Sequence, residues 1–126
     1  MISLGVCADT DFVKKLYKDN SVDFNANSFA VTATCGNEML GYCLYDLTDK
    51  QIVLHTVNPN NDLPLADGII RSTLHVAAER SILDAFYDND SIELVLNLLD
   101  FVKNKALKKI NINKLFTSCN SCKKNS

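Results

Sequence analysis

The chain has 126 residues, of which 47% are hydrophobic and 22% are charged, and its formal net charge is -2. These values predict a single soluble globular domain whose core needs no metal or disulfide support. The charge argues against a nucleic-acid partner, because phosphate binding requires a concentrated basic surface.

Membrane insertion and secretion are not expected either. No apolar run approaches the ~20 residues needed to cross a bilayer. Residues 1–8 lack the basic start of a signal peptide, and Asp9 and Asp11 follow directly. The odd number of cysteines, five, indicates reduced thiols rather than a disulfide framework. We therefore expect a cytoplasmic protein without a membrane partner.

The chain opens with a short strand and an amphipathic helix. Alternating apolar residues predict the strand over residues 1–7. Asp9 or Thr10 can cap a helix that runs to about Lys18. A polar connection over residues 20–27 separates this helix from the next elements.

Three β-type runs follow, over residues 28–34, 40–47 and 51–57. They are rich in β-branched and aromatic residues, which favour strands. Gly36-Asn37 and Thr48-Asp49-Lys50 separate them and are short enough for hairpins. The pattern predicts an antiparallel meander.

The third run leads through a polar turn, 58–62, into a helix-patterned segment, 65–80. Asp62 can cap this helix, and Pro64 is tolerated in its first turn. A strand that feeds a helix N-terminus exposes unpaired N–H groups and the positive end of the helix dipole. Such a junction is a natural place to hold a phosphate or another anion.

The remaining elements are shorter. A strand is predicted over residues 83–87, then a second amphipathic helix to about Leu99, capped by Asp90 or Ser91. A last strand begins near residue 101. The order β-α-β-β-β-α-β-α-β indicates an α/β fold with a mixed sheet and helices on both faces, antiparallel until the crossover makes it parallel.

This order resembles the GNAT superfamily of acetyl-CoA-dependent N-acyltransferases over nearly the whole chain. The likeness is strongest in Leu40-Gly41-Tyr42-Cys43-Leu44, similar to a central strand, and in residues 65–71, similar to the start of the pyrophosphate-binding helix. The resemblance implies one GNAT-like domain over 1–117, with a polar tail at 118–126, and an acetyl-CoA cofactor. The implied cofactor-binding residues are Thr56, Val57, Leu65, Ala66, Asp67 and Gly68.

This chain departs from the phosphate-loop pattern of the family. The pattern is Gln/Arg-x-x-Gly-x-Gly/Ala, and it falls on residues 61–66. Ala66 is permitted, but Asn61 replaces the Gln/Arg and Pro64 replaces the first glycine. Proline removes one N–H donor. Asp62 places a carboxylate where the diphosphate would lie, and two anions repel.

A second family pattern, Asn-x-x-Ala-x-x-Leu-Tyr followed by Leu-Gly-Phe, falls on residues 89–101. Asn89, which the resemblance places at the cofactor, matches, as do Leu99 and Phe101. The tyrosine that often serves as general acid is Leu96 here, which cannot donate a proton. The fold pattern is therefore better preserved than the chemical one.

Two residues are candidates for acid–base chemistry. His55 lies in the third meander strand and could deprotonate an amine. Alternation gives its side chain the direction of Val53 and Val57, so a half-buried structural role is equally open. Tyr87, at a strand end, could donate a proton or simply pack. His75 is expected on the solvent face of its helix, together with Arg71 and Glu79.

The tail carries one strict motif, Cys119-Asn120-Ser121-Cys122. Two thiolates at this spacing can bind zinc, but a closed site needs four ligands, and no second pair is evident. A redox-active pair and a tail without a fixed role are the alternatives.

Two functions remain open at this point. The first is a small acetyl-CoA-dependent N-acetyltransferase whose acceptor is a small-molecule or peptide amine, with catalysis mainly by positioning. The second is a GNAT-like binding or assembly module without acyl transfer, in which Cys119 and Cys122 provide a thiol or metal contact. A homodimer is compatible with both.

Overall fold

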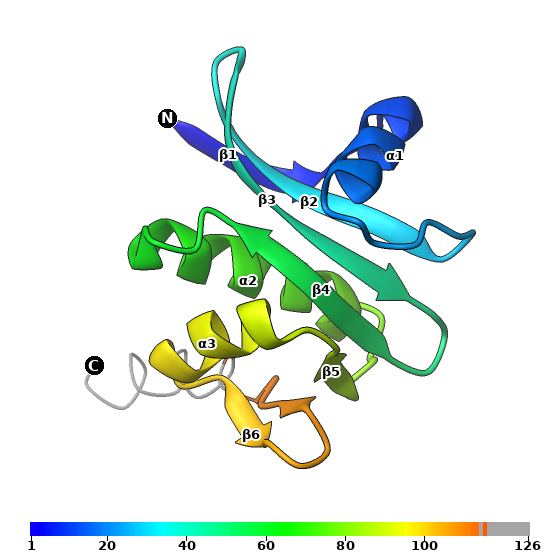
Figure 1. The fold of residues 1–126 in the computed structure, drawn as a ribbon, viewed down its shortest axis with the longest axis vertical. Coiled ribbons are helices and arrows are strands. Elements are labelled where there is room, and N and C mark those ends of the chain that lie inside the picture. Colours follow the sequence, from blue (N-terminus) through cyan, green and yellow to red (C-terminus); the bar gives the residue numbers. More distant parts are fainter. Residues whose placement is uncertain (114, 116–126) are drawn as a thin grey trace.

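The computed structural model describes residues 1–113 and residue 115. Figure 1 shows one mixed sheet with its helices. The elements are β1 (Ile2–Val6), α1 (Thr10–Asp19), β2 (Ser28–Cys35), β3 (Glu38–Leu47), β4 (Ile52–Asn58), α2 (Leu63–Ala78), β5 (Ala85–Tyr87), α3 (Asp90–Leu98), β6 (Val102–Asn104) and β7 (Lys109–Ile110).

The strand order of the sheet is β1-β2-β3-β4-β5-β7-β6. Strands β1 to β4 form the antiparallel meander, and β5 joins β4 in parallel after the α2 crossover. This confirms the predicted mixed sheet and its change of direction. The short strand β7 was not predicted, because two residues are too few to show an alternating pattern.

Helices cover both faces of the sheet, as expected. Side chains alternate along β2 and β3, so Val31 and Cys43 belong to a core cluster with α2, whereas Ala30 and Leu44 belong to another with α1. The buried residues of α3 join the cluster of α2. The larger core therefore lies on the α2 face.

The helix starts agree with the sequence at α1 and α2 but not at α3. Asp9 and Asp62 are the N-caps of α1 and α2, and Pro64 lies in the first turn of α2, which begins two residues earlier than predicted. The cap of α3 is Asn89 rather than Asp90 or Ser91, because residue 89 is still extended and its side-chain oxygen accepts from the Ser91 N–H at 2.8 Å.

The expected solvent face of α2 is also only partly correct. His75 is exposed and lies 3.2 Å from the exposed Glu79. Arg71 is instead half-buried: its Nε donates to Asp67 at 2.9 Å, and its guanidinium lies 5.4 Å from the centre of the Phe101 ring. Arg71 thus connects α2 to the segment after α3.

Strand β4 contains a bulge at His55. Leu44 of β3 pairs with Thr56, and Tyr45 pairs with Leu54, so His55 is an extra residue without a partner in β3. The bulge breaks the alternation that the sequence implied: Val57 packs in the α2-face core, whereas His55 lies against Tyr17 of α1. The prediction that His55 and Val57 point the same way is therefore wrong.

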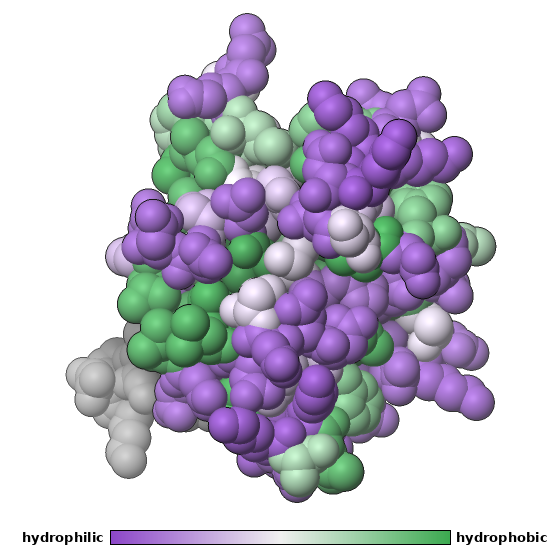
Figure 2. All heavy atoms as spheres, viewed as in Figure 1, coloured by the Kyte–Doolittle hydropathy of each residue, from purple (hydrophilic) through white to green (hydrophobic). Residues whose placement is uncertain are grey.

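No helix within the described part of the chain is long and apolar enough to cross a membrane. The face drawn in Figure 2 carries mainly hydrophilic side chains over its centre, with apolar patches at its margins.

Candidate functional site

The sheet opens where β4 and β5 part. Their parallel pairing covers only Ile52 to Leu54 of β4, opposite Ala85 to Tyr87 of β5. Figure 1 shows β4 continuing past the short β5. The chain leaves the sheet after Tyr87 because Asn89 starts α3. The next residue on each side of the opening is His55 on β4 and Asp88 after β5.

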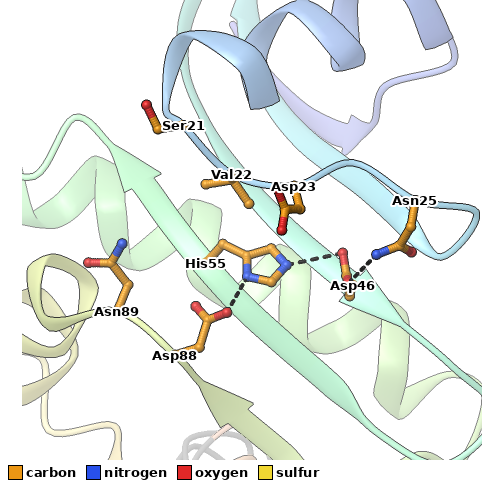
Figure 3. A pocket seen from close by; sticks show the side chains of 8 residues that line it. All are labelled: Ser21, Val22, Asp23, Asn25, Asp46, His55, Asp88 and Asn89. Carbon is orange, nitrogen blue, oxygen red and sulfur yellow. Dashed lines mark hydrogen bonds and ion pairs between the residues drawn. The ribbon is translucent and has the colours of Figure 1, made fainter.

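A pocket of about 410 Å³ lies at this opening. Figure 3 shows the residues that line it, which come from the α1–β2 connection, β3, β4 and the start of α3. They are Ser21, Val22, Asp23, Asn25, Asp46, His55, Asp88 and Asn89. Of these described lining side chains three are carboxylates and none is Lys or Arg, so this part of the pocket is acidic.

His55 is held between two of these carboxylates. Its Nδ1 is hydrogen-bonded to Asp88 Oδ2 at 2.8 Å, and its Nε2 lies 3.0 Å from Asp46 Oδ1, although without the alignment of a hydrogen bond. The side chain is only 10% exposed. A neutral imidazole has one N–H, whereas an imidazolium has two and can serve both carboxylates. Each ring nitrogen of His55 therefore faces a carboxylate oxygen.

Asp46 is the best-anchored carboxylate of the pocket. Ser28 Oγ donates to its Oδ1 at 2.8 Å, and Asn25 Nδ2 donates to its Oδ2 at 3.1 Å. Burial alone would raise the pKa of Asp46, but contacts with His55, Ser28 and Asn25 and the charge of His55 lower it below its ordinary value. Asp46 is therefore ionised at neutral pH.

This pKa shift predicts how stability depends on pH. A carboxyl whose pKa is lower in the folded protein contributes stability above its unfolded-state pKa of about 4, and that stability is lost as the pH falls through the folded value. Asp46→Asn is therefore expected to unfold ~1–2 kcal/mol more easily at pH 7 and to lose less stability between pH 5 and pH 2.5. Urea unfolding at a series of pH values measures both effects.

The matched control for this experiment is Asp49→Asn, an exposed carboxylate in the β3–β4 turn. It should follow the wild-type pH profile. An Asp46→Asn profile that is parallel to the wild type below pH 5 would contradict the assigned shift.

The structure places the two predicted acid–base residues differently. His55 lines the pocket. Tyr87 is 2% exposed, and its hydroxyl donates to Glu93 Oε2 of α3 at 2.9 Å. Burial and this bond raise the pKa of Tyr87 to about 12. Tyr87 is not among the residues that line the pocket.

The predicted cofactor residues of β4 lie beyond the end of its pairing with β5. Thr56 is half-buried, and Val57 is buried in the α2-face core. Their backbone belongs to the part of β4 that β5 does not cover. Asn89 lines the pocket, and its side-chain oxygen accepts from both the N–H and the hydroxyl of Ser91.

The start of α2 has few free donors. Pro64 has no N–H, and the Leu65 N–H donates to Asp62 Oδ1 at 3.2 Å. The Ala66 N–H is bonded to the Asp62 carbonyl at 2.9 Å, inside the helix. Asp62 therefore occupies the position where a helix N-terminus would otherwise hold an anion.

The other two predicted residues of this helix start are engaged elsewhere. Asp67 accepts from Arg71, as described above, and Gly68 lies against β1, where an added Cβ would meet Leu4 Cδ1 at 3.7 Å. The structure thus places residues 65–68 on one turn of α2. Leu65 and Gly68 line a shared pocket beside β1, whereas the Asp67 carboxylate is bonded to Arg71.

Sequence reasoning did not single out Asp23 or Asp88 and attached no role to Asp46. Asp23 lies in the α1–β2 connection, Asp46 lies near the end of β3, and Asp88 follows β5. Polar residues are common at such places, so the pattern alone carried no specific signal. Cys119 and Cys122 lie outside the described residues. Within the described part of the chain, no group of three or more His, Cys, Asp or Glu side chains could hold a metal ion.

Comparison with known proteins finds matches at the level of structure alone. No protein-family model and no curated protein matched the sequence. An aminoglycoside acetyltransferase from an uncultured soil metagenomic sample, solved with sisomicin, matches with a TM-score of 0.57 and 10% identity, over 82% of this chain and 88% of its own.

Two further solved structures match similarly. The ribosomal-protein-S18-alanine N-acetyltransferase from Escherichia coli has a TM-score of 0.56 and 9% identity, over 86% of this chain and 88% of its own. A GNAT family acetyltransferase from Elizabethkingia anophelis, solved with acetyl-CoA bound, has a TM-score of 0.54 and 9% identity, over 79% of this chain and 74% of its own. At these identities the likeness concerns the fold.

Proposed function

We propose that this chain, whose fold is that of the GNAT N-acetyltransferases, transfers an acetyl group from acetyl-CoA to a small cationic amine. The observation that carries the proposal is the acidic pocket at the point where β4 and β5 part. The opening between these strands gives the cofactor and the acceptor a common meeting place.

The charge of the pocket suits an ammonium group. The Asp88 side chain is 51% exposed. Asp23 is also exposed, and its side chain has no ion pair or hydrogen bond with another described residue. An ammonium has three N–H donors and can serve both carboxylates at once. Among the described residues that line the pocket, no side chain is Lys or Arg, and the three carboxylates outnumber the single basic side chain, His55. A cationic amine is therefore the acceptor class that the pocket favours.

The cofactor is proposed to lie along the uncovered part of β4. Beyond Leu54, this strand no longer pairs with β5. An extended ligand can bind such an edge through main-chain hydrogen bonds, as an added strand does. Thr56 and Val57 would then face the amide-containing arm of acetyl-CoA, and Leu65 to Gly68 would lie near its diphosphate. The acetyl-CoA bound to the Elizabethkingia relative supports this cofactor class.

Catalysis would rest mainly on positioning. The ammonium must lose one proton before its nitrogen attacks the thioester carbonyl. The C–N bond then forms, the C–S bond breaks, the nitrogen gives its second proton to solvent, and the leaving thiolate takes a proton from solvent. Both nitrogens of His55 face carboxylates, and the Tyr87 hydroxyl is bonded to Glu93. Because neither of these two described side chains is a free acid or base, alignment of the amine and the thioester would supply most of the acceleration.

A second candidate function is an amine-binding module that does not transfer acetyl groups. The start of α2 favours it, because Pro64 and Asp62 leave this helix turn poorly suited to hold a diphosphate. The acidic pocket would then act alone.

The test is calorimetric titration with acetyl-CoA and with 1,4-diaminobutane, followed by an assay for released CoA thiol. We expect both ligands to bind. Asp88→Asn should weaken amine binding about tenfold, since one charge-assisted bond contributes ~1.5–3 kcal/mol. Asp84→Asn, which removes a nearby exposed carboxylate paired with Lys109, should bind as the wild type does.

The outcomes separate the candidates. Amine binding without acetyl-CoA binding at millimolar cofactor supports the binding module and removes the enzyme. No binding of either ligand removes both functions.

A further inference from the structure

A basic side chain of the protein itself lies at the centre of the acidic pocket. The His55 ring lies between Asp46 Oδ1 and Asp88 Oδ2, at 3.0 and 2.8 Å. The contact with Asp88 has the length of a charge-assisted hydrogen bond, and the contact with Asp46 is of ion-pair length. As an imidazolium, the ring therefore occupies the position in the pocket that suits a cation.

Among the described residues that line the pocket or pack against the ring, no other basic side chain lies beside His55. The α1–β2 connection contributes Asp23, and α1 contributes Tyr17, whose ring lies 6.1 Å from the imidazole in an edge-on orientation. Burial, followed by the charge of Asp46, raises the pKa of Tyr17 above its ordinary value, so Tyr17 stays neutral. Strand β3 contributes Asp46, and the segment after β5 contributes Asp88. All charged neighbours of His55 in the pocket are therefore acidic.

We infer that the His55 imidazolium and a bound amine compete for the same carboxylates, so that each cationic amine that binds displaces one proton from His55. This inference rests on the amine site proposed above. The amine enters as an ammonium, His55 becomes neutral, and the displaced proton passes to the buffer. The exchange of one ammonium group for one proton leaves the charge around these carboxylates unchanged.

This exchange has a consequence for chemistry. A neutral imidazole has one nitrogen with a free lone pair. Once the amine has replaced its proton, His55 can accept a second proton, now from the bound ammonium. Amine binding would thus create the base that the pocket lacks when it is empty.

The exchange also predicts how affinity depends on pH. Consider the pH range in which His55 is protonated in the free protein but not in the complex. In that range, linkage requires the affinity for the amine to rise about tenfold per pH unit. Histidine side chains change charge between about pH 5 and pH 8. Alkyl ammonium groups resemble lysine and remain protonated throughout this range. The change in affinity can therefore be assigned to the protein.

The experiment is titration calorimetry of the full chain with 1,4-diaminobutane at pH 6, repeated in buffers of different ionisation enthalpy. The dependence of the heat on the buffer counts the protons released. We expect close to one proton per amine for the wild type and none for His55→Gln. The chain has two histidines, so His75→Gln, on the exposed side of α2, is the matched control and should release the same number as the wild type.

Imidazole ¹⁵N NMR of the wild type provides a second measurement that needs no variant. We expect both nitrogens of His55 to be protonated in the free protein and one in the complex. Binding without proton release, or the same release from His55→Gln, overturns this inference and leaves the amine site standing. No binding of the diamine overturns both.

Discussion

Replacing Gly41 by alanine is expected to lower the free energy of unfolding by about 3 kcal/mol, at the upper end of what overpacking costs. An added Cβ would collide with the Asn58 carbonyl oxygen and would lie 2.8 Å from both Pro59 Cδ and Ile69 Cδ1. The first two neighbours are a backbone atom and a ring, which cannot rotate away. Urea or thermal unfolding measures the loss.

Gly5→Ala is the matched control, because an added Cβ at Gly5, in β1, meets no atom within 4 Å. It should be neutral or slightly stabilising, since alanine has less conformational freedom in the unfolded chain. Equal stability of the two variants would show that β3, β4 and α2 do not approach one another as closely as Gly41 implies.

The second large effect concerns the cofactor. The double variant Asp62→Asn, Pro64→Gly is expected to bind acetyl-CoA at least tenfold more tightly than the wild type. Asparagine still caps the helix, but it removes the charge that would repel the diphosphate, and glycine restores an N–H donor. Each charge-assisted bond gained contributes ~1.5–3 kcal/mol, and 1.4 kcal/mol corresponds to a factor of ten. Titration calorimetry with acetyl-CoA measures the change.

Asp9→Asn provides the control for this experiment, because Asp9 caps α1 in the same way, with its side chain accepting from the Phe12 N–H at 3.2 Å. It should leave acetyl-CoA affinity unchanged. If the double variant binds no better than the wild type, the start of α2 does not hold the diphosphate, and the proposed cofactor position is wrong.

The sequence predicted the elements of this fold well because their signals are local. Asp9 and Asp62 precede apolar periodic segments and do cap α1 and α2. The meander was readable from β-branched runs separated by short turns. Where local signals compete, as among Asn89, Asp90 and Ser91, the sequence did not identify the cap, because all three residue types are suited to it.

The candidate site was predicted only in part. His55 was singled out for its chemistry, but its direction was wrong, because the bulge in β4 depends on how Leu44 and Tyr45 of β3 pair with it. Asp46 and Asp88 were not recognised as its partners. Asp88 is 33 residues away in the sequence, and no periodic pattern reports a contact over that distance.

By itself, therefore, the sequence determined the order of the elements from β1 to β6, the apolar faces of the helices that pack in the core, and the poor anion-binding character of the turn at Asp62 and Pro64. These features follow from residue types and spacings within a few residues of one another. Only the tertiary structure decided that β4 extends beyond its pairing with β5, that the His55 side chain lies on the α1 face, and that three acidic side chains line the same pocket as His55. These features depend on strand register and crossover packing, which bring distant segments together.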